Sequence, residues 1–133
     1  MTMVTFSDSD LLRNKIVEPA WYLLSIDGHR TWAPSKDGQS NNCFMECVIE
    51  KNADTGDTEF TGVPIELMFN DKPKAKGFIE GFLRGLGVDI QANARYTLES
   101  AVGKKLEVFI ENDTYNGRLV NKCNHKYRVV RAA

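Results

Sequence analysis

A single segment with helical periodicity stands between strand-like segments in this chain of 133 residues. Residues 73–88 read PKAKGFIEGFLRGLGV, and Gly85 or Gly87 offers a position at which a helix can end. The apolar residues of the segment recur at helical spacing and predict one amphipathic helix: Phe78, Ile79, Phe82, Leu83 and Leu86. The glycines at 77, 81 and 85 share one helix face, which would let the helix approach a sheet closely.

The segments on both sides of this helix alternate with the period of two that is typical of strands. WYLLSI, CFMECVIE and EFTGVPIELMF precede the helix, and the first of these strands is expected to end near Asp27. KNADTGDT joins the second and third strands as a turn, and Gly62 with Pro64 indicates a bulge or an edge strand. After the helix, Asn116-Gly117 predicts a tight hairpin between two long strands.

The resulting order is strand, long loop, strand, strand, helix, strand, strand. This order predicts a mainly β protein, a five-stranded OB-fold barrel with a helix between strands 3 and 4. A generic α+β sheet covered by one helix is the alternative. Residues 1–19 form an N-terminal extension, in which Ser7 or Asp8 could cap a short helix, and residues 20–133 form the single domain.

The end of the chain is strongly basic, although the formal net charge is only −1. Residues 1–113 carry 12 Lys and Arg against 18 Asp and Glu, whereas residues 114–133 carry five cations and no carboxylate. Strand alternation places four of these cations on one face: Arg118, Lys122, Lys126 and Arg128. Arg131 is the fifth. Such a strand is either an ordinary solvated face or a surface for an anion such as nucleic acid.

Aromatic residues next to cations favour the nucleic-acid interpretation. The predicted long loop, GHRTWAPSKDGQSNN, carries Arg30, Trp32 and Lys36, and Tyr115 lies in the last hairpin. Proteins that bind single-stranded nucleic acid combine a cationic groove with aromatic platforms, because phosphates need charge and unpaired bases need a flat surface for stacking. The alternative for Trp32 is a side chain that plugs the loop.

At this level the chain resembles a family of small phage-encoded single-stranded-DNA-binding proteins with an OB-fold. The resemblance covers about residues 17 to 131 and is carried by AWYLLSIDG, SKDGQS, FLRGLGVDI and above all GKKLEVFIENDTYNGR. It implies a protein that coats single-stranded DNA during phage replication or recombination, without catalysis. The Trp-Ala-Pro stretch in the first loop departs from the family pattern, and the end VVRAA lacks an acidic tail.

The resemblance implies DNA contacts at Arg30, Trp32, Lys36, Tyr115 and Arg118. Strand alternation adds three further cations to the predicted nucleic-acid-binding set: Lys122, Lys126 and Arg128. The expected partners are single-stranded DNA and replication or recombination proteins, and the sequence leaves a homodimer open. A second hypothesis is an OB-like protein-interaction module whose basic strand docks an acidic partner.

Catalytic and metal chemistry receives little support from the sequence. On a regular strand Cys43 and Cys47 lie roughly 13 Å apart, too far to share one zinc ion. Cys123 and His125 lie about 6.6 Å apart along their strand, beyond the reach of a nucleophile and its base. We therefore expect core cysteines, no cofactor, no metal and no enzyme activity, with a small hydrolase as the least favoured hypothesis.

The location of the protein follows from what its segments lack. No stretch approaches the roughly 20 apolar residues of a membrane span, and residues 1–19 contain no apolar run of the signal-peptide kind. Three cysteines without a compact spacing fit reduced thiols. The expectation is a cytoplasmic protein, in the host cytoplasm if a phage encodes it, with no membrane partner.

Overall fold

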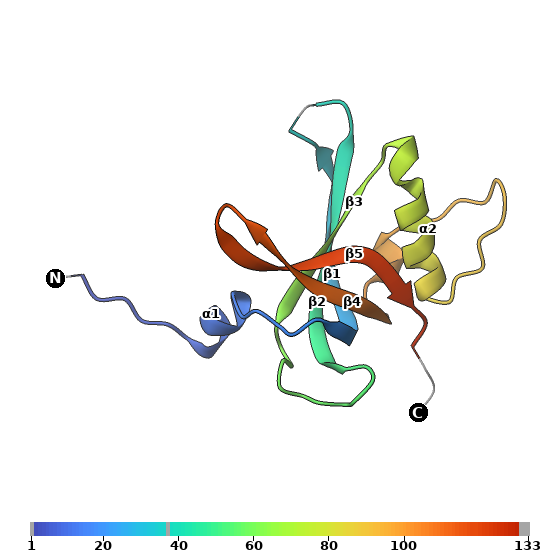
Figure 1. Cartoon of the computed structure of the whole chain (residues 1–133). Helices are drawn as coiled ribbons and strands as arrows, with labels where there is room; N and C mark the ends of the chain where they lie inside the picture. The colour runs from blue at the N-terminus through green and yellow to red at the C-terminus, as the bar shows by residue number, and fades with distance from the viewer. Residues whose placement is uncertain (1, 37, 131–133) are drawn as a thin grey trace.

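The computed structural model describes residues 2–36 and 38–130, so the predicted basic residue Arg131 lies outside the described residues. The protein is mainly β, with α2 between the third and fourth strands, as the sequence predicts (Figure 1). The strands are β1 (Ala20–Pro34), β2 (Asn41–Asn52), β3 (Pro64–Asn70), β4 (Lys105–Tyr115) and β5 (Arg118–Arg128). The helices are α1 (Asp8–Arg13) and α2 (Lys76–Gly85), with short 3₁₀ helices η1 (Pro73–Ala75) and η2 (Glu99–Ala101).

The five strands form one antiparallel sheet in the order β3-β2-β1-β4-β5. Strands β3 and β5 are therefore the two edges, and no ladder joins them in the described part of the chain. The expected barrel is thus not closed. The two edges are instead separated by α2, which packs against both β3 and β5, and by a cavity that residues of both strands line (Figure 1).

Strand β1 is much longer than the sequence predicts, since it continues to Pro34 and does not end near Asp27. Its first half pairs with both β2 and β4, and its second half pairs with β2 alone up to Pro34 and Asn41. Register shifts interrupt the β1–β2 ladder at three places, including one between Arg30 and Ala33. Glycine, proline and polar residues suggested a long loop here, but a bulged hairpin accommodates them.

The core lies between the curved sheet and α2. Phe82 of α2 is fully buried, and its ring centroid lies 4.8 Å from that of Phe69 on β3 and 5.6 Å from that of Tyr127 on β5. Gly85 provides the close approach that the glycine face predicted, because a Cβ built on it would lie 2.9 Å from the Cβ of Tyr127. Gly81 faces the same ring at an ordinary distance.

Two local predictions about turns and edges are confirmed. Asn116 and Gly117 both have positive φ, 51° and 76°, which is the backbone of the tight turn that Asn-Gly favours between β4 and β5. Pro64, which has no N–H to donate to a neighbouring strand, begins the edge strand β3.

The N-terminal extension contains the short helix α1, which Ser7 caps as one of the two predicted caps. The Ser7 hydroxyl accepts the backbone N–H of Asp10, and the Asp10 carboxylate accepts the backbone N–H of Ser7. This reciprocal capping box explains how a helix of only six residues begins at Asp8. Residues 2–6 before it project away from the domain (Figure 1).

Two asparagine side chains then tie the end of this extension to the β4–β5 hairpin. Asn121 Oδ1 accepts the backbone N–H of Val17 and Asn121 Nδ2 donates to the carbonyl of Lys15, both at 2.9 Å. Asn112 Nδ2 donates to the carbonyl of Val17, also at 2.9 Å. We call these contacts the asparagine clasp. Because the side chain of Val17 is buried in the core, the clasp makes residues 15–17 part of the domain.

Candidate nucleic-acid interface

Three of the predicted cations lie on the outer side of β4 and β5, each beside a carboxylate of β4. Lys122 Nζ lies 3.0 Å from a carboxylate oxygen of Asp113, and Lys126 Nζ lies 3.4 Å from one of Glu111. Arg128 forms an ion pair with Glu107 and another with Asp54, which lies in the turn between β2 and β3. The basic strand therefore has an acidic neighbour within its own sheet.

Aromatic rings complete these cross-strand contacts. The guanidinium of Arg128 lies 4.3 Å from the ring centroid of Trp21, and Lys126 Nζ lies 5.4 Å from that of Phe109. Trp21 and Phe109 contact each other edge to face. The hydrogen bond from Lys122 also lowers the pKa of the Asp113 carboxyl below its usual value. These contacts give the basic strand a role within the domain, since they connect β5 to β4 and β1.

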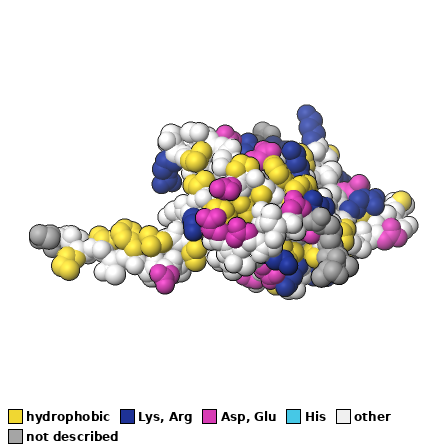
Figure 2. All heavy atoms as spheres, turned by 60° about the horizontal axis from the view of Figure 1, so that its bottom comes forward, with side chains coloured by type: hydrophobic (Ala, Val, Ile, Leu, Met, Phe, Trp, Pro, Cys, Tyr) yellow, Lys and Arg dark blue, Asp and Glu magenta, His cyan; other side chains and the backbone are white. Residues whose placement is uncertain are grey.

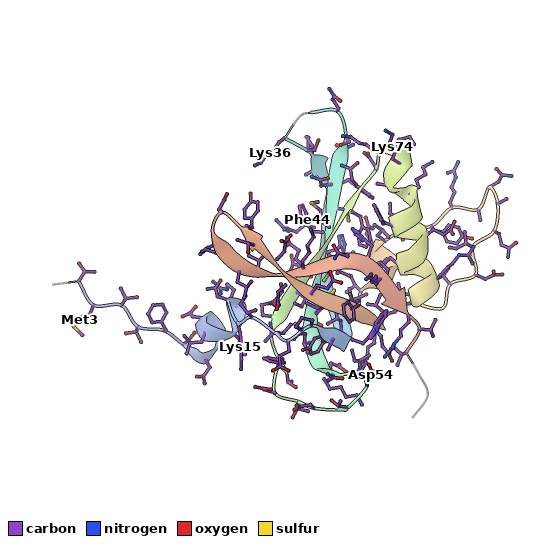
Figure 3. The ribbon with its side chains drawn as sticks, viewed as in Figure 1. Met3, Lys15, Lys36, Phe44, Asp54 and Lys74 are labelled. Carbon is purple, nitrogen blue, oxygen red and sulfur yellow. The ribbon has the colours of Figure 1, made fainter. Side chains whose placement is uncertain are left out.

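A separate, open groove of about 980 Å³ lies between the ends of the two long hairpins and the outer faces of β2 and β3. Its lining includes Lys36, Phe44, Met68, Asn70, Lys72 and Tyr115. Tyr115 is 64% exposed at the end of β4. Figure 3 shows Phe44 on β2 and Lys36 near the end of the β1–β2 hairpin. Apolar surface, aromatic rings and lysines thus share one groove.

Strand alternation explains why apolar side chains reach this outer face. Phe44 and Met68 are directly paired across β2 and β3, and both lie opposite the core face. Their chain neighbours on the other face are all buried: Cys43, Met45, Leu67 and Phe69. An exposed methionine beside a phenylalanine is an apolar platform on the solvent side of the sheet, where a core is not required.

Arg30 lies against this platform. Its guanidinium is 4.1 Å from the ring centroid of Phe44 and forms ion pairs with Glu66 and, at 3.8 Å, with Glu46. All three charged side chains are about half exposed, so these pairs contribute little to stability. A phosphate could therefore compete for the guanidinium at a small energetic cost.

Trp32 lies elsewhere. It lines a different cavity of about 250 Å³ together with His29, Tyr96 and Leu98. The register shift between Arg30 and Ala33 explains this placement, because an extra residue reverses the side to which the next side chains point. Regular alternation would have placed Trp32 on the side of Arg30.

Arg118 also lies outside the groove, in a cavity between β3 and β5. The structure therefore divides the predicted residues into three groups. Lys36 and Tyr115 line the groove, and Arg30 contacts its floor. Trp32 and Arg118 line two other cavities, and the remaining cations lie on the outer face of β4–β5: Lys122, Lys126 and Arg128.

Sequence reasoning missed three residues of the groove: Phe44, Met68 and Lys72. The signal for Phe44 was present, since CFMEC alternates and its two cysteines are expected in the core. The same alternation places Phe44 on the opposite, solvent-facing side of this strand. Met68 follows from the same argument on β3, whereas the position of Lys72 depends on tertiary structure.

The cysteines are core residues, as the sequence indicates. Cys43 and Cys47 are buried, and Cys123 packs against the core. Burial raises the pKa of the Cys47 and Cys123 thiols to about 12. Within residues 2–36 and 38–130, no three His, Cys, Asp or Glu side chains are grouped so that they could hold a metal ion.

His125 is a structural residue whose ring stacks on Phe78 at a centroid distance of 4.4 Å. Its Nδ1 lies 2.7 Å from the hydroxyl oxygen of Tyr127. Its backbone has an unusual positive φ of 56°, within β5. Burial lowers the pKa of the imidazole. These contacts leave His125 without the geometry of a base beside Cys123.

Comparisons with known proteins add no further constraint: no protein-family model matches the chain, and no curated protein has a similar sequence. In the described ranges no helix is long and apolar enough to cross a membrane.

Proposed function

We propose that the protein binds single-stranded DNA with low sequence specificity, without catalysis, through the groove between the two long hairpins. The observation that carries this proposal is the combination of an apolar, partly aromatic floor with lysines at its rim: Phe44, Met68, Tyr115, Lys36 and Lys72. Protection of single strands during phage replication or recombination is the role that the sequence resemblance implies.

The arrangement of the sheet supports an OB-type fold. In that fold a partly open barrel of five strands binds oligonucleotides on the face of strands 2 and 3, between the loops that join strands 1 and 2 and strands 4 and 5. The groove has this location, since it lies on β2 and β3 beside the ends of the β1–β2 and β4–β5 hairpins. The open side between β3 and β5 agrees with a partly open barrel.

The chemistry of the groove suits unpaired nucleotides. Base stacking on an aromatic side chain contributes about 1–3 kcal/mol per base, and Phe44 and Tyr115 offer two rings. Lys36 and Lys72 are placed to contact phosphates. If Arg30 also exchanges its carboxylates for phosphate, three contacts would give a slope of about −2 in the logarithm of affinity against that of salt. Binding is then modest and salt-dependent.

The test is fluorescence anisotropy of a labelled oligo-dT, titrated with the protein at several salt concentrations and repeated with a duplex. Phe44→Ala and Tyr115→Ala should each raise the Kd by about 5-fold to 150-fold, the equivalent of one lost stack. Tyr96→Ala is the matched control, because Tyr96 is an exposed aromatic residue that lines another cavity.

Charge variants test the phosphate contacts. Lys36→Gln and Lys72→Gln should weaken binding and make the salt slope shallower, whereas Lys122→Gln should change neither, since Lys122 lies outside the groove, on the outer face of β4–β5. Equal effects of Lys122→Gln and Lys36→Gln would place the site on the basic strand. No binding of any oligonucleotide at low salt would refute the proposal.

Docking of an acidic protein on the last strand receives less support from the geometry. Arg128 would have to give up Glu107, a buried carboxylate of its own domain, before it could bind a carboxylate of a partner.

A further inference from the structure

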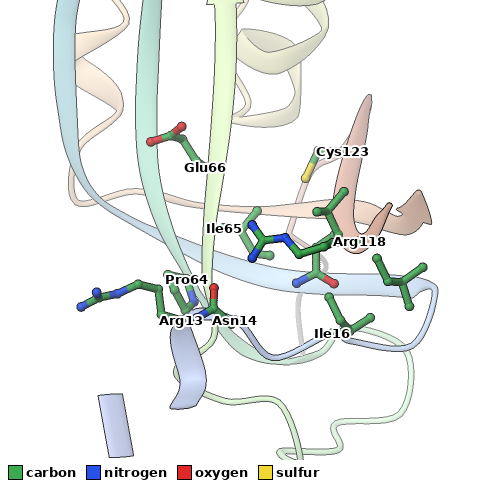
Figure 4. Close-up of a pocket in the computed structure, with 11 residues that line it drawn as sticks. Arg13, Asn14, Ile16, Pro64, Ile65, Glu66, Arg118 and Cys123 are labelled. Carbon is green, nitrogen blue, oxygen red and sulfur yellow. The ribbon is translucent and has the colours of Figure 1, made fainter. Parts of the chain in front are cut away.

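The two edge strands of the sheet enclose an unfilled groove. Strands β3 and β5 each have a neighbour on one side only, so each leaves a row of backbone N–H and C=O groups available for another strand. Between them lies a cavity of about 520 Å³ (Figure 4). Its apolar lining includes Ile16, Pro64, Ile65, Leu119 and Val120. We call this cavity the edge groove.

The N-terminal segment of the same molecule is apolar, yet its large side chains are exposed. Residues 2–6 read TMVTF, and Phe6 is 67% exposed, with Met3 and Val4 more exposed still. Figure 2 shows these hydrophobic side chains along the arm that projects from the domain. Valine, threonine and phenylalanine favour extended strands, and the segment contains no charged side chain, proline or glycine. We call residues 2–6 the arm.

The arm is held away from the edge groove of its own chain. Leu12 of α1 packs against the core beside Gly62, and the asparagine clasp fixes residues 15–17 on the domain. Between these anchors, Arg13, Asn14 and Ile16 already form one wall of the groove (Figure 4). Beyond Leu12 the chain leads outward through α1, so the arm points away from its own domain (Figure 1).

We propose that the arm of a second copy of this chain lies in the edge groove as an added strand, and that two copies exchange arms reciprocally. Five extended residues span about 17 Å, comparable to the seven residues of β3, about 23 Å. The added strand would pair with exposed backbone of an edge strand and bury Phe6 against Leu119 and Val120. Reciprocal exchange uses the same two surfaces twice and closes a two-fold dimer.

Charge at the mouth of the groove agrees with this occupant. Arg118 lines the groove, and in the ranges that the structure describes it has no ion-pair partner. Asp8 lies two positions after Phe6, the last residue of the arm, and has no ion-pair partner in these ranges either. With Phe6 in the groove, Asp8 of the incoming chain comes within reach of Arg118. The inference is independent of DNA binding, because it uses neither Phe44 nor the lysines of the other groove.

The first experiment measures the mass of the full-length chain by sedimentation or light scattering. We expect a dimer of the 15.0 kDa chain. Phe6→Asp and Leu119→Arg should each raise the dimer Kd about tenfold or more, because burial of a large apolar side chain contributes on that scale. Phe6→Leu should retain the dimer. Val129→Arg is the matched control for Leu119→Arg, since the two side chains are 53% and 54% exposed and Val129 lies outside the groove.

The second experiment locates the arm. The photoreactive analogue p-benzoylphenylalanine replaces Phe6 in unlabelled protein, which is mixed with ¹⁵N-labelled wild type and irradiated. We expect unlabelled arm peptides joined to labelled peptides that contain residues 64–66 or 118–123. A monomeric wild type, a dimer unaffected by Phe6→Asp, or crosslinks confined to one isotope or to another surface would each overturn the proposal.

Discussion

Replacement of Gly85 by alanine tests how closely α2 approaches β5. An alanine in a helix interior is favoured over glycine by about 0.5–1 kcal/mol, so Gly→Ala normally stabilises a helix. At Gly85 the new Cβ would lie 2.9 Å from the Cβ of Tyr127, an atom fixed to the backbone of β5. Forcing an extra carbon into a packed contact costs about 1–3 kcal/mol. The clash outweighs the gain, and we expect Gly85→Ala to lower the free energy of unfolding by about 1–2 kcal/mol.

Two glycines of the same helix provide the controls. A Cβ on Gly81 would lie 3.8 Å from the ring of Tyr127, and one on Gly77 would meet nothing within 4 Å. Both variants should therefore be neutral or more stable, by up to about 1 kcal/mol. Urea unfolding followed by circular dichroism measures all three, and the Tm of Gly85→Ala should fall by about 3–8 °C. If Gly85→Ala were as stable as Gly81→Ala, the close packing of α2 on β5 would be wrong.

Three other predictions concern acid stability, thiol reactivity and the outer ion pairs. Burial lowers the pKa of His125 below 6.5, so the unfolded chain takes up a proton at this imidazole before the folded chain does as pH falls. The free energy of unfolding should therefore decrease from pH 7 to 5.5, and it should decrease less steeply in His125→Asn. Urea titrations at several pH values measure this difference. Cys47 is fully buried, and burial raises the pKa of its thiol to about 12, so it should react with a thiol reagent at pH 8 only after denaturant is added; fast labelling of Cys47 in the native protein would contradict its burial. Glu107→Gln should lower the free energy of unfolding by about 1–3 kcal/mol in urea titrations, because it weakens the pair with Arg128 at a buried carboxylate, whereas Asp113→Asn at an exposed pair should change it by less than about 1 kcal/mol.

Local chemistry made much of the fold predictable from the sequence. The order of strands, the helix over residues 76–85 and the tight turn at Asn116-Gly117 depend on side-chain periodicity and backbone preference within a few residues. The length of β1 was not predictable in this way, because Gly28 and Pro34 are read as loop residues until β2 is available to pair with them. A closed barrel was expected, and the open side between β3 and β5 was missed because it depends on the tertiary packing of these two strands.

In the candidate site, too, some positions could be predicted from local sequence and others depend on tertiary structure. Alternation on β2 was enough to place Phe44 on the solvent face, and the hairpin signal was enough to expose Tyr115. The partners of Lys122 and Arg128 could not be assigned, because they depend on the register of β4 against β5 and, for Asp54, on a contact between residues 74 positions apart. Trp32 lines a different cavity because of one bulge, which sequence does not reveal.

The asparagine clasp has a consequence for the way the chain is cut by proteases. The boundary drawn from composition separates residues 1–19 from the domain, but Lys15 and Val17 are held by three side-chain amide hydrogen bonds. A protease should therefore cleave readily after Arg13, in the exposed end of α1, and slowly after Lys15. The smallest fragment that survives trypsin would begin at Asn14, and a shorter one that began at Ala20 would lose Val17 from its core and should unfold more easily.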